Sequence, residues 1–378
     1  MSENHGQKDY SSYFEALEQQ LNSPPNRRDQ SETAVSQNRT EKIKRKGIYG
    51  VFRLRKSVLA VIAVALIVVI VLAVSSFKGV TVDSKQLNVP QNNSIAVEDN
   101  TAQKEQQKLK ITYEFTDETV AIPTANDAKN VIIIDKTTKK VVAERNARER
   151  AFPASTTKIM TLLVAVENMT DLNDSFVMTY EITDPLFVEG ASVAGFLDGE
   201  TVSMTDLLYG TILPSGADAA TALAIKICGN EKQFVKLMNE KVEELGLKNT
   251  HFDNVTGLHS ENNYSTAYDM AVILDAALQN ETCKKVLSTY QHTTAKTQQN
   301  PNGILLSSTL FTHMYGTEPE TATILGGKTG FVNESGYCIA SYGKANQTEN
   351  EYIVVTLGNS SKWPAFYGQI DLYKEFVK

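Results

Sequence analysis

Residues 57–77, SVLAVIAVALIVVIVLAVSSF, contain neither a charge nor a proline and divide the chain into unlike parts. A membrane-spanning helix needs roughly 17–25 apolar residues, and a core helix this apolar on every face is rarely so long. A cleavable signal peptide is the alternative, because Ala73, Val74 and Ser75 resemble a small-residue cleavage site. Signal peptides, however, carry about 7–15 apolar residues behind a short basic segment. The run therefore predicts an uncleaved transmembrane signal anchor.

The flanks of this run predict its orientation. A basic cluster precedes it, formed by Lys42, Lys44, Arg45, Lys46, Arg53, Arg55 and Lys56. Because cytoplasmic flanks are rich in Lys and Arg, we expect a cytoplasmic N-terminus, a single pass through the cell membrane and an extracytoplasmic C-terminal part. Residues 1–56 form a polar, basic tail that is typical of disorder, residues 78–111 a polar linker, and residues 112–378 the folded domain.

Composition excludes several classes of partner and site. The formal net charge is −7, whereas a nucleic-acid partner would usually show as a basic excess. Cys228, Cys283 and Cys338 lie far apart, so neither a sulfur metal site nor a disulfide framework is predicted. No H-E-x-x-H stretch supports a metallopeptidase. We expect no metal, no cofactor and no nucleic acid.

The hydrophobic pattern predicts one α/β (α+β) domain. NVIIIDKTTKKVVAE, residues 130–144, is typical of a β-hairpin. Helical periodicity begins at Pro153 and recurs at 203–213, 218–228, 231–247, 266–279 and 363–377, while strands are predicted at 323–331, 335–343 and 351–359. Strands at both ends of the domain predict a sheet built from its two ends and flanked by helices.

The stretch FPASTTKIMTLLVAV, residues 152–166, contains a candidate nucleophile. Residues i and i+3 share a helix face, so Ser155 and Lys158 project together. A serine hydroxyl needs such an adjacent base to act as a nucleophile, and free N–H groups of a first helical turn favour a developing oxyanion. The alternative is a capped helix start with an exposed lysine.

Two further motifs decide between these readings. Ser215 stands in a Pro-Ser-Gly turn between two predicted helices. Lys328, Thr329 and Gly330 stand on a predicted strand behind two glycines, which allow another backbone or an extended peptide to approach closely. The order Ser-x-x-Lys, Ser-Gly-x, Lys-Thr-Gly is typical of penicillin-binding proteins and class A β-lactamases.

The chain resembles the D-alanyl-D-alanine carboxypeptidases, the low-molecular-mass penicillin-binding serine peptidases. The resemblance runs from about residue 127 to 378 and includes ERAFPASTTKIMT, LLYGTILPSGADAATALA, LGLKNTHFDNVTGLH, YSTAYDMAVIL and GGKTGFVNESGYCIASYG. It implies a DD-peptidase/β-lactamase-like fold with an antiparallel sheet. It also implies a serine peptidase that removes the terminal D-alanine from peptidoglycan stem peptides ending in D-Ala-D-Ala, with β-lactams as acylating inhibitors.

The resemblance also implies roles for the motif residues. Ser155 would be the nucleophile of an acyl-serine intermediate, Lys158 its proton acceptor, and Ser215 a proton relay toward the leaving group. Lys328 and Thr329 of the Lys-Thr-Gly motif, which Gly330 completes, would hold the substrate carboxylate. The backbone N–H groups of Ser155 and Phe331 would form the oxyanion hole. Lys158 must be uncharged to act as a base, and a nearby Lys328 ammonium would disfavour its protonation.

Two departures from the family pattern leave alternatives open. Position 217 is Ala, where the family usually has an Asn that contacts substrate and orients the lysine. Many members also carry a second, β-rich domain and a C-terminal anchor, whereas here residues 331–378 suffice only for the rest of the sheet and one helix. The alternatives are a DD-transpeptidase, a β-lactamase-like hydrolase, or a catalytically weak cell-wall-binding module. A class A β-lactamase would carry E-x-x-L-N between Ser215 and Lys328, and none is present.

Overall fold

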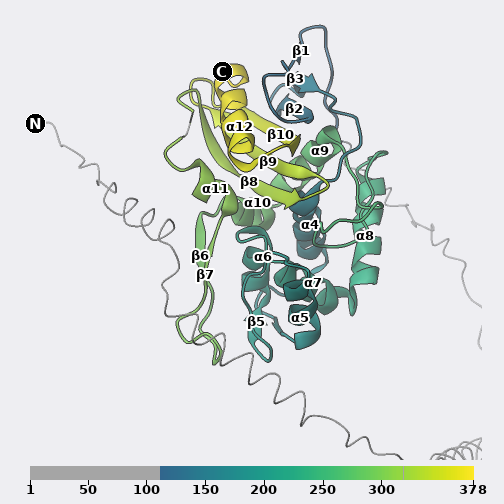
Figure 1. The fold of residues 1–378 in the computed structure, drawn as a ribbon, viewed down its shortest axis with the longest axis vertical. Helices are drawn as coiled ribbons and strands as arrows, with labels where there is room; N and C mark the ends of the chain where they lie inside the picture. Colours follow the sequence, from purple (N-terminus) through teal and green to yellow (C-terminus); the bar gives the residue numbers. More distant parts are fainter. Residues whose placement is uncertain (1–110, 318) are drawn as a thin grey trace, which may run out of the picture. The chain divides into compact units, whose positions relative to one another are not determined.

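The computed structural model describes residues 111–317 and 319–378, which form a sheet with helices on both faces (Figure 1). The predicted tail (1–56), the predicted transmembrane span (57–77) and the predicted linker up to residue 110 lie outside the described residues. Among the helices of the described ranges, none combines the length and the apolar character that crossing a membrane requires.

The main sheet joins the two ends of the domain, as the sequence predicts. Its strands lie in the order β1-β3-β2-β10-β9-β8. Their bounds are Val120–Ala121 (β1), Asn130–Asp135 (β2), Lys140–Arg145 (β3), Ala322–Val332 (β8), Gly336–Ala345 (β9) and Glu351–Asn359 (β10). Neighbouring strands are antiparallel, with β10 pairing β2 at the junction between the two ends. The short β1 is the exception, because it lies parallel to β3.

Strand β2 shows why the sheet is covered on both faces. All six of its residues are buried, and successive side chains of a strand point to opposite faces. Ile132 and Ile134 accordingly pack into one hydrophobic cluster, whereas Val131 and Ile133 pack into another. Each fully buried Ile or Val contributes roughly 1.5–3 kcal/mol relative to an exposed one, so the continuous apolar run fixes β2 at the centre of the domain.

Most helices lie on the side of the sheet to which Ile132 and Ile134 point. They are α4 (Lys158–Asn168), α5 (Tyr180–Val188), α6 (Met204–Ile212), α7 (Ala217–Cys228), α8 (Glu231–Glu244), α9 (Ala267–Leu278) and α10 (Glu281–Leu287). Helices α9 and α10 contact the strands, and the others pack on helices. Helix α4 lies among α6, α7, α8 and α9 and buries eight consecutive residues, Lys158 to Ala165. The turn directly before α4 is a 3₁₀ helix, η1 (Ala154–Thr157), rather than part of the α-helix.

Two helices cover the opposite face. Helix α11 (Thr309–Met314) contacts β8, and helix α12 (Lys362–Phe376) contacts β9 and β10, in the second hydrophobic cluster. The sequence pattern predicts α12 correctly, but neither α5, α10 nor α11. Two small ribbons are also not predicted, β4 (Ser175–Val177) with β5 (Thr201–Ser203) and β6 (Gln291–Thr293) with β7 (Leu305–Ser307).

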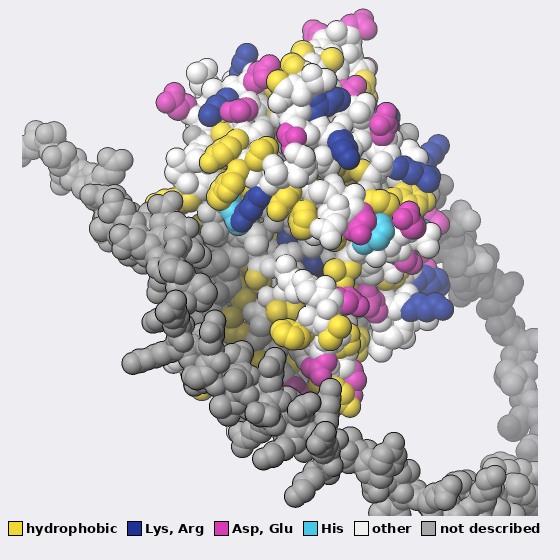
Figure 2. Space-filling model, in the orientation of Figure 1, with side chains coloured by type: hydrophobic (Ala, Val, Ile, Leu, Met, Phe, Trp, Pro, Cys, Tyr) yellow, Lys and Arg dark blue, Asp and Glu magenta, His cyan; other side chains and the backbone are white. Residues whose placement is uncertain are grey.

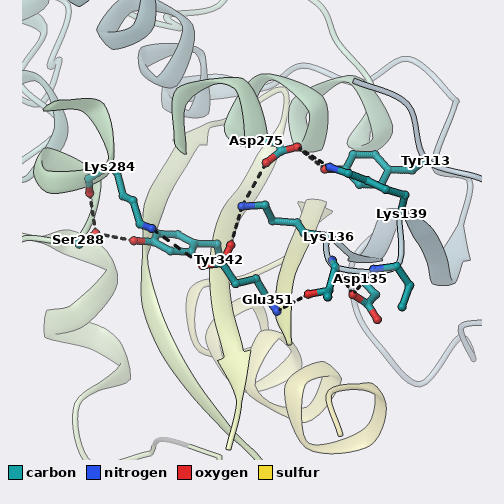
Figure 3. Close-up of polar contacts among 11 residues, drawn as sticks. Tyr113, Asp135, Lys136, Lys139, Asp275, Lys284, Ser288, Tyr342 and Glu351 are labelled. Atoms are coloured by element: carbon teal, nitrogen blue, oxygen red, sulfur yellow. Dashed lines mark hydrogen bonds and ion pairs between the residues drawn. The ribbon is translucent and has the colours of Figure 1, made fainter. Parts of the chain in front are cut away.

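A network of charged side chains around the buried Asp275 ties the sheet to α9 (Figure 3). Asp275 of α9 is 1% exposed at its side chain and lies 3.2 Å from Lys136, which also pairs with Glu351 of β10 at 2.9 Å. The Tyr113 hydroxyl donates to the same Asp275 carboxylate. A buried charge is costly unless it is paired and hydrogen-bonded, and here the carboxylate has both kinds of partner. The network therefore fixes α9, which packs against α4 on its other side.

Candidate active site

Ser155 and Lys158 meet where η1 passes into α4. The Lys158 Nζ lies 3.1 Å from the Ser155 Oγ and 2.6 Å from the backbone oxygen of Thr256. The Ser155 hydroxyl lies 3.4 Å from the same Thr256 oxygen. The residue before the serine, Ala154, has φ +47°, a left-handed conformation that non-glycine residues rarely adopt. The expected i, i+3 pair is therefore formed, in 3₁₀ rather than α geometry.

Burial gives Lys158 the protonation behaviour of a base. The residue is only 2% exposed. Loss of hydration lowers the pKa of the Lys158 ammonium to about 7, and the negative charge of Asp218 opposes this shift. Repulsion by Lys328 is the cause expected from the sequence, but desolvation is the main physical cause. Near neutral pH a large share of Lys158 is uncharged, and its lone pair can accept the Ser155 proton.

Lys328 is the second buried lysine of the site. It lies on β8, is 1% exposed, and donates from its Nζ to the Thr329 backbone oxygen at 2.7 Å. Burial, reinforced by the charge of Lys158, holds the pKa of Lys328 well below its usual range. A ligand carboxylate beside this amine would favour its charged form.

The backbone of the Lys-Thr-Gly strand lies very close to neighbouring segments of the domain. A methyl group at Gly326 would lie 2.4 Å from the Leu287 backbone oxygen, so the glycines before Lys328 admit another part of this chain's own backbone. A methyl group at Gly330 would lie 2.7 Å from the Ser155 backbone nitrogen. Only glycine therefore lets β8 approach the serine this closely. The Thr329 hydroxyl lies 2.6 Å from that of Thr309 on α11.

Ser215 occupies the turn between α6 and α7. Its φ is +67° and it is 6% exposed. A left-handed non-glycine residue costs of order 1–3 kcal/mol and persists only where the surroundings enforce it. Here the backbone N–H of Gly216 donates to the Gly210 oxygen at 2.9 Å, and that of Ala217 to the Ser192 oxygen at 2.8 Å. The neighbouring residues thus hold the Ser215 backbone in this conformation.

A pocket of about 550 Å³ brings the motif residues together. Predicted site residues in its lining are Ser155, Lys158, Ser215, Thr329, Gly330 and Phe331. Lys328 does not line it directly, although its neighbours on β8 do. Phe331 is 48% exposed, and its ring contacts that of Tyr337 in a tilted arrangement with 4.4 Å between centroids. On the face that Figure 2 presents, acidic and basic side chains of the described residues are interspersed rather than gathered by sign.

Ala217 lines the same pocket, at the position where the resemblance leads one to expect an asparagine. Its methyl group offers Lys158 no hydrogen bond. The adjacent Asp218 does not replace the missing amide, because its carboxylate accepts the backbone N–H groups of Ala194, Gly195 and Phe196 at 2.7, 3.1 and 3.4 Å. Asp218 therefore holds the segment after α5 in place as a wall of the pocket.

Several residues of the site were missed by the sequence analysis. The Thr256 backbone oxygen is the shortest polar contact of Lys158, but a carbonyl leaves no side-chain signal. Thr309, His259 and His313 also line the pocket. The glycine in NVTGL is the only sequence hint that the segment around Thr256 approaches another backbone. Within residues 111–317 and 319–378, no three His, Cys, Asp or Glu side chains gather so that they could hold a metal ion.

Comparison with known proteins gives one consistent family. The model of the peptidase S11 family, D-alanyl-D-alanine carboxypeptidase, matches residues 116–361. The carboxypeptidase DacF of Bacillus subtilis (strain 168) is 34% identical over 237 residues, which cover 63% of this chain and 59% of the relative. DacA of Escherichia coli (strain K12) is 34% identical over 239 residues, covering 61% and 55%. The chain thus spans about three fifths of the length of the curated relatives it matches.

Solved structures agree with the sequence comparison. The Streptomyces K15 DD-transpeptidase superposes with a TM-score of 0.57 at 30% identity, covering 66% of this chain and 97% of that one. Penicillin-binding protein 5 from Haemophilus influenzae gives 0.58 at 29% identity, covering 68% and 71%. The family model spans most of the chain, and the motif residues that line the pocket lie inside the matched region. This chain therefore belongs to the D-alanyl-D-alanine carboxypeptidase family of serine peptidases.

Proposed function

We propose that this chain is a serine-type D-Ala-D-Ala carboxypeptidase that removes the terminal D-alanine from peptidoglycan pentapeptides through an acyl-serine intermediate. The observation that carries the proposal is the contact of 3.1 Å between the Ser155 Oγ and a buried Lys158 Nζ whose pKa lies at about 7. A positioned base whose pKa is near the working pH gives efficient proton transfer.

Acylation follows from this contact. The Ser155 Oγ attacks the carbonyl carbon of the penultimate D-alanine while its proton passes to the Lys158 Nζ. The tetrahedral oxyanion is stabilised by the backbone N–H groups of Ser155 and Phe331, which act as preorganised donors. The C–N bond then breaks, and the leaving amine takes a proton through Ser215. Free D-alanine departs and the ester on Ser155 remains.

Deacylation restores the enzyme. A water molecule attacks the ester carbonyl, its proton passes to Lys158, and the Ser155 oxygen leaves with a proton as the hydroxyl. The products are the shortened stem peptide and the free serine. An amine could take the place of water and form a new amide bond. The similarity to a DD-transpeptidase favours this second candidate function, and the partition between water and amine is set by which acceptor reaches the acyl-enzyme.

Substrate selection rests on the anionic end of the peptide. Lys328 and Thr329 bind the terminal carboxylate, whose charge restores the ammonium form of Lys328. Gly330 and Phe331 continue the strand along which the extended peptide lies, an arrangement that uses main-chain hydrogen bonds at a sheet edge. β-Lactams would acylate Ser155 in the same way, because they present a reactive carbonyl and a carboxylate to the same groups.

The sequence also supports a location for this activity. We propose that residues 57–77 anchor the enzyme in the cell membrane by a single pass, with residues 1–56 in the cytoplasm and the catalytic domain, 112–378, outside it. The support is the apolar run and its basic N-terminal flank. The matched relatives are bacterial D-alanyl-D-alanine carboxypeptidases, and a substrate in the cell wall requires an extracytoplasmic site.

Intact-mass analysis after incubation with benzylpenicillin tests the mechanism. We expect one covalent adduct on the wild type and none on Ser155→Ala. The matched control is Ser203→Ala, because Ser203 caps α6 by accepting from the Asp206 N–H and does not line the pocket. That variant should still form the adduct. If the wild type forms no adduct and releases no D-alanine from a pentapeptide, the proposed function is wrong.

A further inference from the structure

The backbone oxygen that contacts Lys158 belongs to a short segment between α8 and α9. Thr256 accepts from the Lys158 Nζ at 2.6 Å. One turn further along α4, the Thr161 hydroxyl donates to the backbone oxygen of Val255 at 2.7 Å. Consecutive carbonyls of this segment therefore face consecutive turns of the helix that carries the lysine. The position of the lysine amine depends on the position of this segment.

Asn254 holds that segment in shape. Its side-chain oxygen accepts three hydrogen bonds, from the Thr256 N–H at 3.1 Å, the Thr256 hydroxyl at 3.1 Å and the Gly257 N–H at 2.7 Å. Its side-chain amide donates to the Leu258 oxygen at 3.0 Å. One asparagine thus bridges both sides of the Thr256 peptide unit. Asn side chains that bond the backbone two residues ahead are a common device for fixing a turn.

The position of the Thr256 carbonyl matters because it orients the lone pair of the Lys158 amine. A neutral amine has two N–H bonds and one lone pair. If one N–H donates to the Thr256 oxygen, the lone pair is free to face the Ser155 hydroxyl, which is what proton abstraction requires. Among the described residues, Ser155 and Thr256 supply the polar contacts of the Lys158 Nζ. The Ala217 methyl group cannot add a third.

We propose that Asn254 is a positioning residue for acylation, which fixes the Thr256 carbonyl and, through it, the Lys158 amine beside Ser155. The proposal rests on the proposed function, since it assigns a supporting role within the same acyl transfer. It also accounts for the missing asparagine at position 217, because the Thr256 oxygen supplies the lysine with a hydrogen bond that does not depend on that position. Asn254 itself does not line the pocket, so it acts through Thr256 rather than on the substrate.

The test compares Asn254→Ala with a matched control on the same segment. Asn239 on α8 also bonds this segment, accepting from the Phe252 N–H at 2.9 Å and donating to the Phe252 oxygen at 2.8 Å. It does so away from Lys158. In the full chain we expect Asn254→Ala to lower the rate constant of acylation by benzylpenicillin about 10²-fold, the cost of a small misplacement of a reacting group. Asn239→Ala should lower the thermal unfolding midpoint but keep the rate within about threefold of wild type.

Asn254→Asp supplies a readout that a merely structural role would not move. Its carboxylate can accept the same three hydrogen bonds. Its charge would favour the Lys158 ammonium, as the charge of Asp218 does, whereas a charged Lys328 would disfavour it. The pH at which acylation reaches half its maximum should therefore rise, with activity recovered at higher pH. Asn262→Asp adds the same charge at an exposed position of the segment and should leave that pH unchanged.

The experiments distinguish failure of the positioning role of Asn254 from failure of the proposed function. Wild-type acylation by Asn254→Ala, or equal losses in Asn254→Ala and Asn239→Ala, would overturn the positioning role and leave the proposed function standing. An unchanged pH profile in Asn254→Asp would also overturn it, even if the alanine variant did not fold. Failure of the wild-type protein to acylate at all would overturn the proposed function and the inference together.

Discussion

Replacing Lys158 by methionine should abolish acylation and stabilise the protein. Methionine has a similar length and no charge, so it can fill the site without the cost of removing an ammonium group from water. At pH 7 the folded state must hold an amine whose pKa is about 7, whereas the ordinary value in an unfolded chain is near 10.5. At roughly 1.4 kcal/mol per pKa unit this difference opposes folding by about 5 kcal/mol. The variant loses the two polar contacts of the amine, about 1 kcal/mol each, and should gain about 3 kcal/mol.

The sign of the pH dependence follows from proton binding. Between pH 7 and 10.5 the unfolded lysine binds a proton that the folded lysine does not, so the free energy of unfolding of the wild type rises with pH. Lys158→Met lacks this contribution. Its advantage should therefore be largest at and below pH 7 and should shrink toward pH 10.

Urea unfolding at pH 7 and pH 9.5 measures the effect. The only tryptophan in the sequence, Trp363, lies at the start of α12 and is 50% exposed, so its fluorescence reports on the folded domain. Lys241→Met is the matched control. Burial acts to lower the pKa of Lys241, but its hydrogen bonds to Glu167 and Glu244 outweigh this and raise it. Loss of that lysine should lower stability at pH 7. If Lys158→Met is the less stable protein at pH 7, or its advantage does not shrink with pH, the burial argument is wrong.

Three further outcomes follow from the site. Acylation of Ser155 by benzylpenicillin should rise about tenfold from pH 6 to pH 8 as Lys158 becomes neutral around pH 7, and a flat rate profile would contradict its role as base. Gly330→Ala should lower acylation more than about 100-fold, because the methyl group would lie 2.7 Å from the Ser155 nitrogen, and wild-type kinetics would contradict the close approach. Lys328→Met should raise KM for a D-Ala-D-Ala peptide roughly 10- to 100-fold through loss of a charged hydrogen bond, and an unchanged KM would show that the carboxylate binds elsewhere.

Periodicity in the sequence predicts the elements that bury a continuous apolar pattern. The hairpin of β2 and β3, the helices α4, α6, α7, α8, α9 and α12, and the strands β8 to β10 are confirmed. The small elements are different, because distant side chains hold them in place. Strand β6, for example, is tied to α6 by His292, whose ring nitrogen lies 2.6 Å from Asp206. The loop between β6 and β7 is tied to the residue before β5 by Asn300, which donates to Glu200 at 2.8 Å. A three-residue strand with few apolar residues shows no periodicity by itself.

The order of motifs in the sequence predicts which residues meet, but not what sets their chemistry. The resemblance names Ser155, Lys158 and Ser215, and these residues do line one pocket. Burial of the lysine depends on the packing of α4 among four other helices, which no local pattern reveals. For that reason repulsion by Lys328 was predicted as the cause of the shifted pKa, where desolvation dominates. The Thr256 carbonyl and the Asn254 side chain that holds it are likewise visible only in three dimensions.

The pocket concentrates features that oppose folding. Ala154 and Ser215 both hold left-handed backbone conformations, at a cost of order 1–3 kcal/mol each. Lys158 and Lys328 are buried, and neither forms an ion pair with a carboxylate of the described residues. The sheet does not need these features, because its two faces are covered by apolar side chains regardless of what the pocket contains. Their common property is their location at or next to the pocket that Ser155 lines. Substitutions that relieve them should therefore raise stability while acylation falls, and Lys158→Met is the case in which the two effects separate most clearly.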